Sequence, residues 1–347
     1  MRYNYQALKE FGRQVMVNAG LEQDEADLFM ENLLFADARG IGSHGVSRLI
    51  NYSKRGKCGV ITPGADAEVI RDSTSALLID GHNGVGAKIG RQVMDLCISR
   101  ARETGCCVAA VRHANHFGAA AFYTKPAAEQ GMIAFVVSNS EAAVAPIGGA
   151  QAMLGTNPLS VAVPAGRNDD FNLDMATSVV ARGKVVLAQK NGQSIPLGWA
   201  VDKNGVETTD PDAALDGGYM LPFGGAKGYG ISLFIDLMCS CLSGALNSRT
   251  SHRFWSDYES PQNIGYFMVV IDPGKFLPLE EFTDRVDGML DEFKACPPAA
   301  GVDRVYIPGE IEAGKERASE ALGIEISDAV AEELREVGKV YGVEFPF

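Results

Sequence analysis

The chain has 347 residues, of which 46% are hydrophobic and 22% charged, as in a globular protein too long for one ordinary core. Its 31 Lys and Arg against 44 Asp and Glu give a net charge of −13. Because the sequence contains no block of basic residues, no nucleic-acid partner is expected. The seven cysteines form no Cys-x-x-Cys pair, which argues against zinc ribbons and redox motifs and indicates free thiols in a reducing compartment.

The length indicates two domains or one elaborate domain, and the lack of repeats and linkers indicates that two domains would be interleaved. No apolar signal core begins the chain, and the longest apolar stretch, 229–246, contains Asp236 and is marginal for a bilayer span. The sequence therefore predicts a cytoplasmic protein without a membrane segment.

The first candidate binding segment follows two predicted helices, 4–20 and about 24–39, whose apolar residues recur at helical spacing. Ser43 is the predicted N-cap of a short third helix. His44 and Arg48, four residues apart, would share one face of that helix. A helix N-terminus beside an arginine is suited to a carboxylate, although a solvated turn with a surface arginine gives the same pattern.

A glycine-rich turn lies between a predicted strand, 76–80, and a predicted helix that ends near Glu103. Its Gly84-x-Gly86 spacing is similar to the fingerprint of dinucleotide-binding Rossmann folds. The next strand, however, ends in Arg112 and His113, and not in an acid that could bind a ribose. A Rossmann domain is therefore kept only as an alternative.

Two histidines, His113 and His116, follow the apolar strand 106–111 and precede a predicted helix over 119–130. Side chains at strand ends often form active sites, because the strand fixes them while the loop leaves them open to a ligand. Ordinary loop histidines would give the same pattern. A metal site made from this pair would need further ligands at regular spacing, which the sequence does not offer.

A second glycine-rich segment, 223–230, contains Lys227. Its glycines could bring N–H groups to a phosphate, or could loosen the loop so that the following helix packs. Asn204-Gly205 predicts a tight two-residue hairpin turn, and residues 247–264 are expected to form a surface excursion. The remaining apolar runs predict strands over 132–137, 159–163, 171–175 and 266–271 and helices over about 280–293 and 328–341.

Five segments, in this order along nearly the whole chain, resemble the type 2 malate/L-lactate dehydrogenase family. They are residues 36–45, 115–118, 155–158, 174–178 and 226–230. The family includes malate, lactate, sulfolactate and ureidoglycolate dehydrogenases, a diketogulonate reductase and a cyclic imino-acid reductase. Five motifs together are far more specific than any one of them.

The resemblance implies an α/β protein whose cofactor domain is not a Rossmann fold and has a largely antiparallel sheet. That domain would comprise residues 121–299, inserted in a mixed α/β substrate and dimerisation domain formed by 1–120 and 300–347. The resemblance also implies NAD or NADP as cofactor, a small 2-hydroxy or 2-oxo acid as substrate, and a homodimer. Gly84 and Gly86 would then serve packing only.

The resemblance also assigns roles to single residues. His116 would be the general acid/base, although some branches of the family give this role to His44. Arg48 and Ser43 would hold the substrate carboxylate, since arginine grips a carboxylate with two prongs, and an imidazole titrates near neutral pH. Glu141, where the ureidoglycolate branch has an aspartate, would contact the far end of the substrate. The cofactor site would be lined by Ser140, Asp174, Met175, Ala176, Lys227, Pro308, Gly309 and Glu310.

Three other functions remain open from the sequence. A reductase of a diketo sugar acid or a cyclic imino acid would belong to the same family. A metal-dependent hydrolase or lyase would use His113 and His116, with activity that a chelator removes. A non-catalytic relative would bind the cofactor without turnover.

Overall fold

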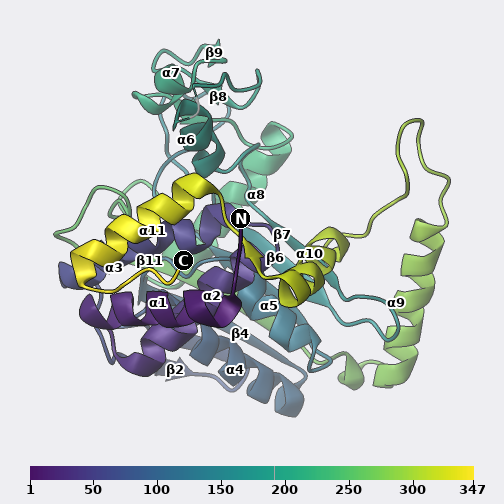
Figure 1. Ribbon diagram of the computed structural model, residues 1–347. Coiled ribbons are helices and arrows are strands. Elements are labelled where there is room, and N and C mark those ends of the chain that lie inside the picture. Colours follow the sequence, from purple (N-terminus) through teal and green to yellow (C-terminus); the bar gives the residue numbers. More distant parts are fainter. Residues whose placement is uncertain (191) are drawn as a thin grey trace.

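The computed structural model describes residues 1–190 and 192–347 and has one seven-stranded mixed sheet at its centre (Figure 1). The strand order is β2-β3-β4-β11-β5-β6-β7, in which β3 and β4 are the parallel neighbours. This order confirms an α/β fold with a largely antiparallel sheet, unlike the parallel sheet of a Rossmann domain. The strands are β2 (Glu68–Asp72), β3 (Ala76–Asp80), β4 (Cys106–Ala114), β5 (Ile133–Ser138), β6 (Leu159–Val163), β7 (Phe171–Met175) and β11 (Ile264–Ile271).

β4 and β11 lie at the centre of the sheet because their apolar residues can be buried on both faces. β11 pairs with β4 on one side and with β5 on the other, so that Val269 faces both Val108 and Phe135. The helices α4 (Gly86–Thr104) and α5 (Ala121–Ala128) cover one face of these strands. The buried ends of β3 and β4 are thereby fixed where the loop with His116 begins.

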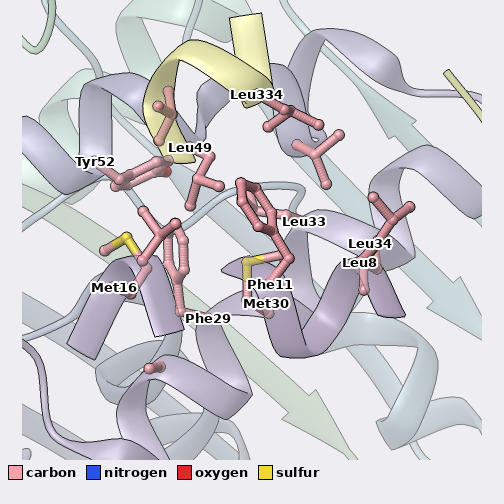
Figure 2. Packing of buried hydrophobic residues seen from close by; sticks show 14 of the residues in the cluster. Leu8, Phe11, Met16, Phe29, Met30, Leu33, Leu34, Leu49, Tyr52 and Leu334 are labelled. Carbon is pink, nitrogen blue, oxygen red and sulfur yellow. The ribbon is translucent and has the colours of Figure 1, made fainter. Parts of the chain in front are cut away.

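A second core is formed by helices outside the sheet, namely α1 (Tyr5–Asn18), α2 (Gln23–Ala38), α3 (Leu49–Lys57) and α11 (Asp328–Tyr341). Figure 2 shows Phe11, Phe29, Tyr52 and Leu334 of these helices packed together. α1 and α2 approach closely because Gly12 leaves room for the side chain of Met30. The two predicted N-terminal helices are confirmed, and α3 is fixed to the same core.

A small module lies apart from the main sheet, at the top of Figure 1. The predicted hairpin is present there, with Val201 opposite Glu207, but the predicted two-residue turn is wrong. The Asp202 carboxylate accepts the N–H groups of Asn204 at 2.8 Å and Val206 at 3.0 Å, which stabilises a wider turn. The module consists of α6 (Arg182–Lys190), β8 (Ala200–Val201), β9 (Glu207–Thr208), α7 (Pro211–Leu215) and β10 (Tyr219–Met220).

Helix α9 (Leu279–Lys294) stands away from the body of the protein, at the right of Figure 1. It is attached to the turn between β6 and β7, where the Asp287 carboxylate accepts the N–H groups of Arg167 at 2.7 Å and Asn168 at 3.0 Å. No helix among the described residues is long and apolar enough to cross a membrane. The other elements are β1 (Arg2–Tyr3), α8 (Ala226–Asp236), the π-helical η3 (Leu237–Leu242), the 3-10 turn η4 (Pro273–Lys275), α10 (Glu310–Leu322) and β12 (Ile324–Glu325).

The two predicted domain ranges share the main sheet. β2, β3 and β4 come from residues 1–120, whereas β5, β6, β7 and β11 come from 121–299, and the two sets meet where β4 pairs with β11. The division of the chain at these boundaries stays a prediction.

Candidate active site

The loop between α2 and α3 carries Ser43, His44 and Arg48. It forms two 3-10 turns, η1 (Gly42–His44) and η2 (Val46–Arg48), separated by Gly45 in an extended conformation. The predicted N-cap is therefore wrong, since Ser43 lies inside η1 and its hydroxyl contacts His44 Nδ1 at 3.0 Å. His44 and Arg48 are brought together by two short turns and not by one continuous helix.

Asp37, in the last turn of α2, anchors this loop to the helix. Its carboxylate accepts the Val46 N–H at 2.7 Å. A Cβ added at Gly45 would overlap the same carboxylate, so the loop needs a glycine there. Burial raises the pKa of Asp37 to about 7, against the opposing effect of the Val46 hydrogen bond.

Arg48 is the cation of this site. Its Nε donates to Ser43 O at 2.5 Å, and its guanidinium carbon lies 4.0 Å from the centroid of a Trp255 ring. Within the described part of the chain, its two Nη atoms have no hydrogen-bond or carboxylate partner. Burial lowers the pKa of Arg48 to about 10, so it stays protonated at neutral pH. A cation held in this way can bind a carboxylate of a ligand.

The rings of His44 and His116 stack, with centroids 5.8 Å apart and planes inclined by 17°. Burial, followed by the charge of Arg48, lowers the pKa of His44 to about 4. Burial also lowers the pKa of His116 well below its usual value, with further contributions from His44, Arg48 and Arg55. Both imidazoles are therefore neutral near pH 7 when no anion is bound.

The His116 ring is fixed through Nδ1, which contacts the Tyr52 hydroxyl and, at 3.2 Å, the Gly118 N–H. The Tyr52 ring is itself held in the helical core, edge-on to Phe29 at 4.7 Å between centroids (Figure 2). Nε2 of His116 has no partner among the described residues and is the nitrogen left for a ligand. Sequence reasoning missed Tyr52, although it follows Arg48 by four residues and so lies on the same side of α3.

Residues 244–263 form a wall of the site. The predicted surface excursion over 247–264 is irregular and partly exposed, but the prediction did not include its contacts with the site. Phe254 is buried, and its ring centroid lies 5.1 Å from that of His116. Gln262 Oε1 accepts the His116 N–H at 2.8 Å. The buried Arg55 of α3 holds this wall by donating to Asp257 O at 2.6 Å. No apolar period or motif in the sequence indicated these contacts.

Glu141 lies at the edge of the same site. Its carboxylate accepts the Phe254 N–H. Burial raises the pKa of Glu141, while the Phe254 hydrogen bond and then Arg182, Arg253 and Arg55 lower it. The start of α6 also borders the site, since a Cβ added at Gly183 would lie 3.3 Å from Nη2 of Arg48. The small module and Glu141 thus bring charges of both signs close to Arg48.

His113 does not join His116. Its Nδ1 bonds to Asp80 at 2.8 Å, and Arg112 Nε donates to the same carboxylate at 3.1 Å. The described residues also contain no group of three His, Cys, Asp or Glu side chains placed to hold a metal ion. The geometry therefore offers no support for a metal-dependent site built from His113 and His116.

Several predicted cofactor residues meet at one edge of the main sheet, where β5 ends, β6 begins and β7 ends. Val137 pairs with Leu159, which pairs with Met175, so the residues that follow β5 and β7 lie close together. The Ser140 hydroxyl accepts the Thr156 N–H at 3.1 Å just beyond β5. Ala176 follows Met175 at the same edge.

The N-terminus of α8 reaches this edge as well, because the Phe223 N–H donates to Thr177 O at 3.0 Å. Lys227 lies in the first turn of α8 and is exposed. Gly224 and Gly225 precede it with positive φ, and an added Cβ at either would meet nothing within 4 Å. An open helix N-terminus with a lysine suits the phosphates of a dinucleotide.

Asp174 and residues 308–310 contact β7 and its neighbours. The Asp174 carboxylate accepts the Ala121 N–H at 3.0 Å, and burial raises its pKa to about 6. Pro308 O accepts the Asn172 N–H at 3.0 Å, and Gly309 approaches Asn172 with a φ of 95°. The Glu310 carboxylate accepts the Ile307 N–H at 3.2 Å and pairs with Arg304 at 3.1 Å. The role of all these residues in cofactor binding stays a prediction.

A family profile described as malate/L-lactate dehydrogenase matches residues 3–335. The chain belongs to the malate/L-lactate dehydrogenase family. It is 39% identical to the malate dehydrogenase of Pyrococcus horikoshii, over 95% of this chain and 92% of that protein. It is 38% identical to the L-sulfolactate dehydrogenase of Methanocaldococcus jannaschii, over 95% of this chain and 94% of that protein.

The solved structure of the Pyrococcus horikoshii malate dehydrogenase matches this family member with a TM-score of 0.91 at 36% identity, covering 99% of this chain and 96% of that one. Two further relatives have names that specify the cofactor. The ureidoglycolate dehydrogenase (NAD(+)) of Escherichia coli K12 is 34% identical, over 96% of this chain and 95% of its own. The (2R)-3-sulfolactate dehydrogenase (NADP(+)) of Chromohalobacter salexigens is 34% identical, over 91% of this chain and 92% of that protein.

Proposed function

We propose that this malate/L-lactate dehydrogenase family member interconverts a small 2-hydroxy acid and its 2-oxo acid, with NAD or NADP as cofactor. The observation that carries the proposal is Arg48, without a carboxylate partner among the described residues, beside the stacked His44 and His116. The carboxylate of such an acid is adjacent to the carbon that reacts. One cation next to a proton-transfer group therefore places the reacting carbon correctly.

Arg48 would hold the substrate carboxylate through its Nη atoms, with the Ser43 hydroxyl beside it. A charge-assisted bond of this kind is stronger in a partly buried site than in water. Burial is the main cause of the lowered pKa of His44 and of His116, and the bound carboxylate would offset the smaller contribution that Arg48 makes to both. Substrate binding would thus raise both pKa values toward neutrality, where proton transfer is most efficient.

His116 is the proposed general acid/base because its Nδ1 is held, while its Nε2 has no partner among the residues that the structure describes. In the structure Nδ1 accepts the Gly118 N–H, which leaves the proton of the neutral ring on Nε2. To accept the hydroxyl proton of the substrate at Nε2, the ring would take the other tautomer, in which Nδ1–H donates to the Tyr52 hydroxyl oxygen. In the opposite direction, protonated Nε2 would return that proton to the 2-oxo group. His44, stacked on His116, would keep water from one face of the ring and tune its pKa.

The cofactor would lie along the sheet edge, held by Ser140, Asp174, Met175 and Ala176 and bordered by residues 308–310. Lys227 and the open N-terminus of α8 would hold its phosphates. When bound, the nicotinamide accepts or supplies the hydride, which no side chain of the protein can do.

Glu141 would contact the far end of the substrate, together with the nearby Arg182. The relatives are named for malate, sulfolactate and ureidoglycolate, which are acids with different far ends. Because Glu141 is a carboxylate, a far end that donates a hydrogen bond would be favoured over one that carries a second anion.

The loss of NADH or NADPH absorbance with a panel of acids tests this function. The panel should contain oxaloacetate, pyruvate, sulfopyruvate, a diketo sugar acid and a cyclic imino acid, each with both cofactors and with and without a chelator. Turnover of at least one of these compounds that survives the chelator is expected. Tight cofactor binding without turnover of any acid would contradict the proposal and indicate a binding protein.

Replacing each histidine tests the proton-transfer assignment. His116→Ala is expected to lower kcat by about 10²- to 10⁴-fold, the range typical of a general acid/base. Its dissociation constant for NADH, measured by fluorescence, should stay within about twofold, because the ring lies on the substrate side. A near-normal kcat in His116→Ala, with a large loss in His44→Ala, would transfer the role to His44.

A homodimer is the proposed assembly. Large apolar side chains are exposed on two helical segments, with Phe234 and Leu237 in α8 and η3 and Met289 and Phe293 in α9. Surfaces of this kind on a single chain usually mark an interface.

The cytoplasm is the proposed compartment, because all seven cysteines are free thiols. Fractionation of cells that produce the tagged protein would test it.

A further inference from the structure

The glycine-rich turn over residues 81–86 lies directly against the backbone of the loop that carries His116. The turn follows β3, and because β3 and β4 run parallel with Asp80 opposite Arg112, both strands end at the same edge of the sheet. The turn is tightly bent, with positive φ at His82 (48°) and Asn83 (56°). These conformations are uncommon for residues other than glycine, so surrounding contacts must stabilise them.

The N–H groups of this turn are occupied by protein acceptors. Gly81 N–H donates to Arg112 O at 2.9 Å, and Asn83 N–H donates to His113 O at 2.8 Å. His82 N–H donates to the Asp80 carboxylate at 2.9 Å. In a dinucleotide-binding turn such groups would face a phosphate. Here the N–H groups of Gly81 and Asn83 bind the segment that leads into His116, and that of His82 binds Asp80 at the end of β3.

The bonds also run in the opposite direction, from the His116 loop to the turn. The buried Asn115 donates its side-chain amide to Asn83 O at 2.7 Å and to Gly84 O at 3.1 Å. At Gly86, the first residue of α4, an added Cβ would lie 2.6 Å from Asn115 O and closer still to His116 O. Both neighbours are backbone oxygens of the His116 loop, so neither could move aside unless the loop backbone shifted.

We infer that the turn over residues 81–86 supports the loop that carries His116 and fixes its position, and that Gly86 is a positioning residue for His116. This inference rests on the proposed role of His116. The absence of a side chain at Gly86 sets how closely the His116 backbone approaches α4, and Asn115 fixes its orientation. Together with the Gln262 bond to the His116 N–H, these contacts set the distance from Nε2 to a substrate held by Arg48.

Gly86→Ala tests the inference in the full-length enzyme. A misplacement of about 1 Å in the reacting geometry can cost about a hundredfold in rate, so kcat should fall by about ten- to a hundredfold. The dissociation constant for NADH should stay within about twofold. The primary isotope effect on kcat with 4-deuterated NADH should rise, because the chemical step becomes limiting. A purely structural defect would lower the amount of active enzyme without changing that isotope effect.

Two further variants keep the test decisive. Ile98→Val removes a methylene from the buried side of the same helix, at about 1 kcal/mol of stability, and should leave kcat and the isotope effect unchanged. Asn115→Ala removes the bonds to Asn83 O and Gly84 O without a clash, and should reproduce the kinetic change if Gly86→Ala does not fold. Normal kcat in folded Gly86→Ala and in Asn115→Ala would overturn the inference. An inactive wild type would instead count against the proposed function.

Discussion

Asp37 shows how one side chain controls several functional residues without touching a ligand. It lies in α2, yet its carboxylate accepts the Val46 N–H in the middle of the loop that carries His44 and Arg48. Burial is the dominant cause of its raised pKa. The close approach of Gly45 to this carboxylate leaves no room for a side chain at position 45. The position of Arg48 therefore depends on a carboxyl group that changes charge near neutral pH.

Asp37→Asn is expected to change how stability depends on pH. The pKa of Asp37 in the folded protein, about 7, lies above its usual value of 3.8, so the folded state binds the proton more tightly. This contribution to stability is complete below pH 3.8 and is lost as the pH rises through 7. Asparagine keeps an acceptor for Val46 but does not titrate. Urea unfolding should therefore show the variant gaining about 2 kcal/mol over the wild type between pH 5 and pH 8.

The exposed Asp216 provides the matched control for this measurement. Asp216→Asn should give the same difference from the wild type at both pH values. If Asp37→Asn behaved in the same way as Asp216→Asn, the carboxyl of Asp37 would not be buried in the way that the Val46 and Gly45 contacts require.

At the residue scale, sequence reasoning placed His44 and Arg48 together and selected His116, because each lies in a short motif. The structure brings His116 next to His44, and the roles of all three stay predictions. It did not find Tyr52 or Gln262, which contact His116 from α3 and from the loop before β11. Nothing local distinguishes a tyrosine whose hydroxyl meets a histidine from one that only fills a core. Such contacts depend on how distant segments pack, which the sequence pattern does not encode.

Among the secondary-structure elements, α3 connects the substrate loop to the wall formed by residues 244–263. Arg55 of this helix is 1% exposed and has three carbonyl acceptors in that wall, of which Asp257 O is the nearest at 2.6 Å. Among the described residues, no carboxylate forms an ion pair with this buried guanidinium, which is held by these carbonyl dipoles and lies 5.5 Å from the centroid of the Phe254 ring. α3 thus fixes Phe254, whose ring packs at a tilt of 36° against the ring of His116.

Arg55→Met is expected to release this wall while keeping most of the volume of the side chain. Three carbonyl groups lose their donor, which should lower the free energy of unfolding by about 2–3 kcal/mol. The KM for the acid should rise more than the KM for the cofactor, because the wall borders Arg48 and His116. Urea unfolding, steady-state kinetics and limited proteolysis within residues 244–263 would measure these effects.

Lys57→Met removes a positive charge from the same helix at an exposed position, and should leave all three measurements near the wild-type values. Equal protease resistance of Arg55→Met and Lys57→Met would show that Arg55 does not hold the wall.

Elements with a strong periodic or continuous apolar pattern could be predicted closely. β6 and β7 have the bounds that their apolar residues predict, and α1 and α2 agree with their predicted bounds within two residues at both ends. The Asn204-Gly205 signal located the hairpin of β8 and β9, whereas the two-residue strand β10 carries too little pattern to be identified. The turn after Val201 was mispredicted because the Asp202 side chain competes with the local preference of Asn204-Gly205.

At the scale of the whole molecule, α9 has apolar side chains on two sides, whereas an ordinary surface helix turns one apolar stripe toward the core. Asp287 and Leu290 are its buried residues, and Asp287 bonds to Arg167 and Asn168. Met289 and Phe293, on the same helix, form an outer stripe and are 59% and 53% exposed. A second copy of the chain that covers this outer stripe would account for its exposure.

A charge placed on this stripe tests whether it forms the proposed dimer interface. Met289→Glu should convert the protein from dimer to monomer in light scattering coupled to size-exclusion chromatography, because burying an unpaired carboxylate at an interface costs several kcal/mol. Leu322→Glu is the matched control, since Leu322 in α10 is 64% exposed, close to the 59% of Met289. It should leave the wild-type mass unchanged. If Met289→Glu also kept that mass, the apolar stripe of α9 would lie outside the interface, and the exposed side chains of α8 and η3 would be the remaining candidates.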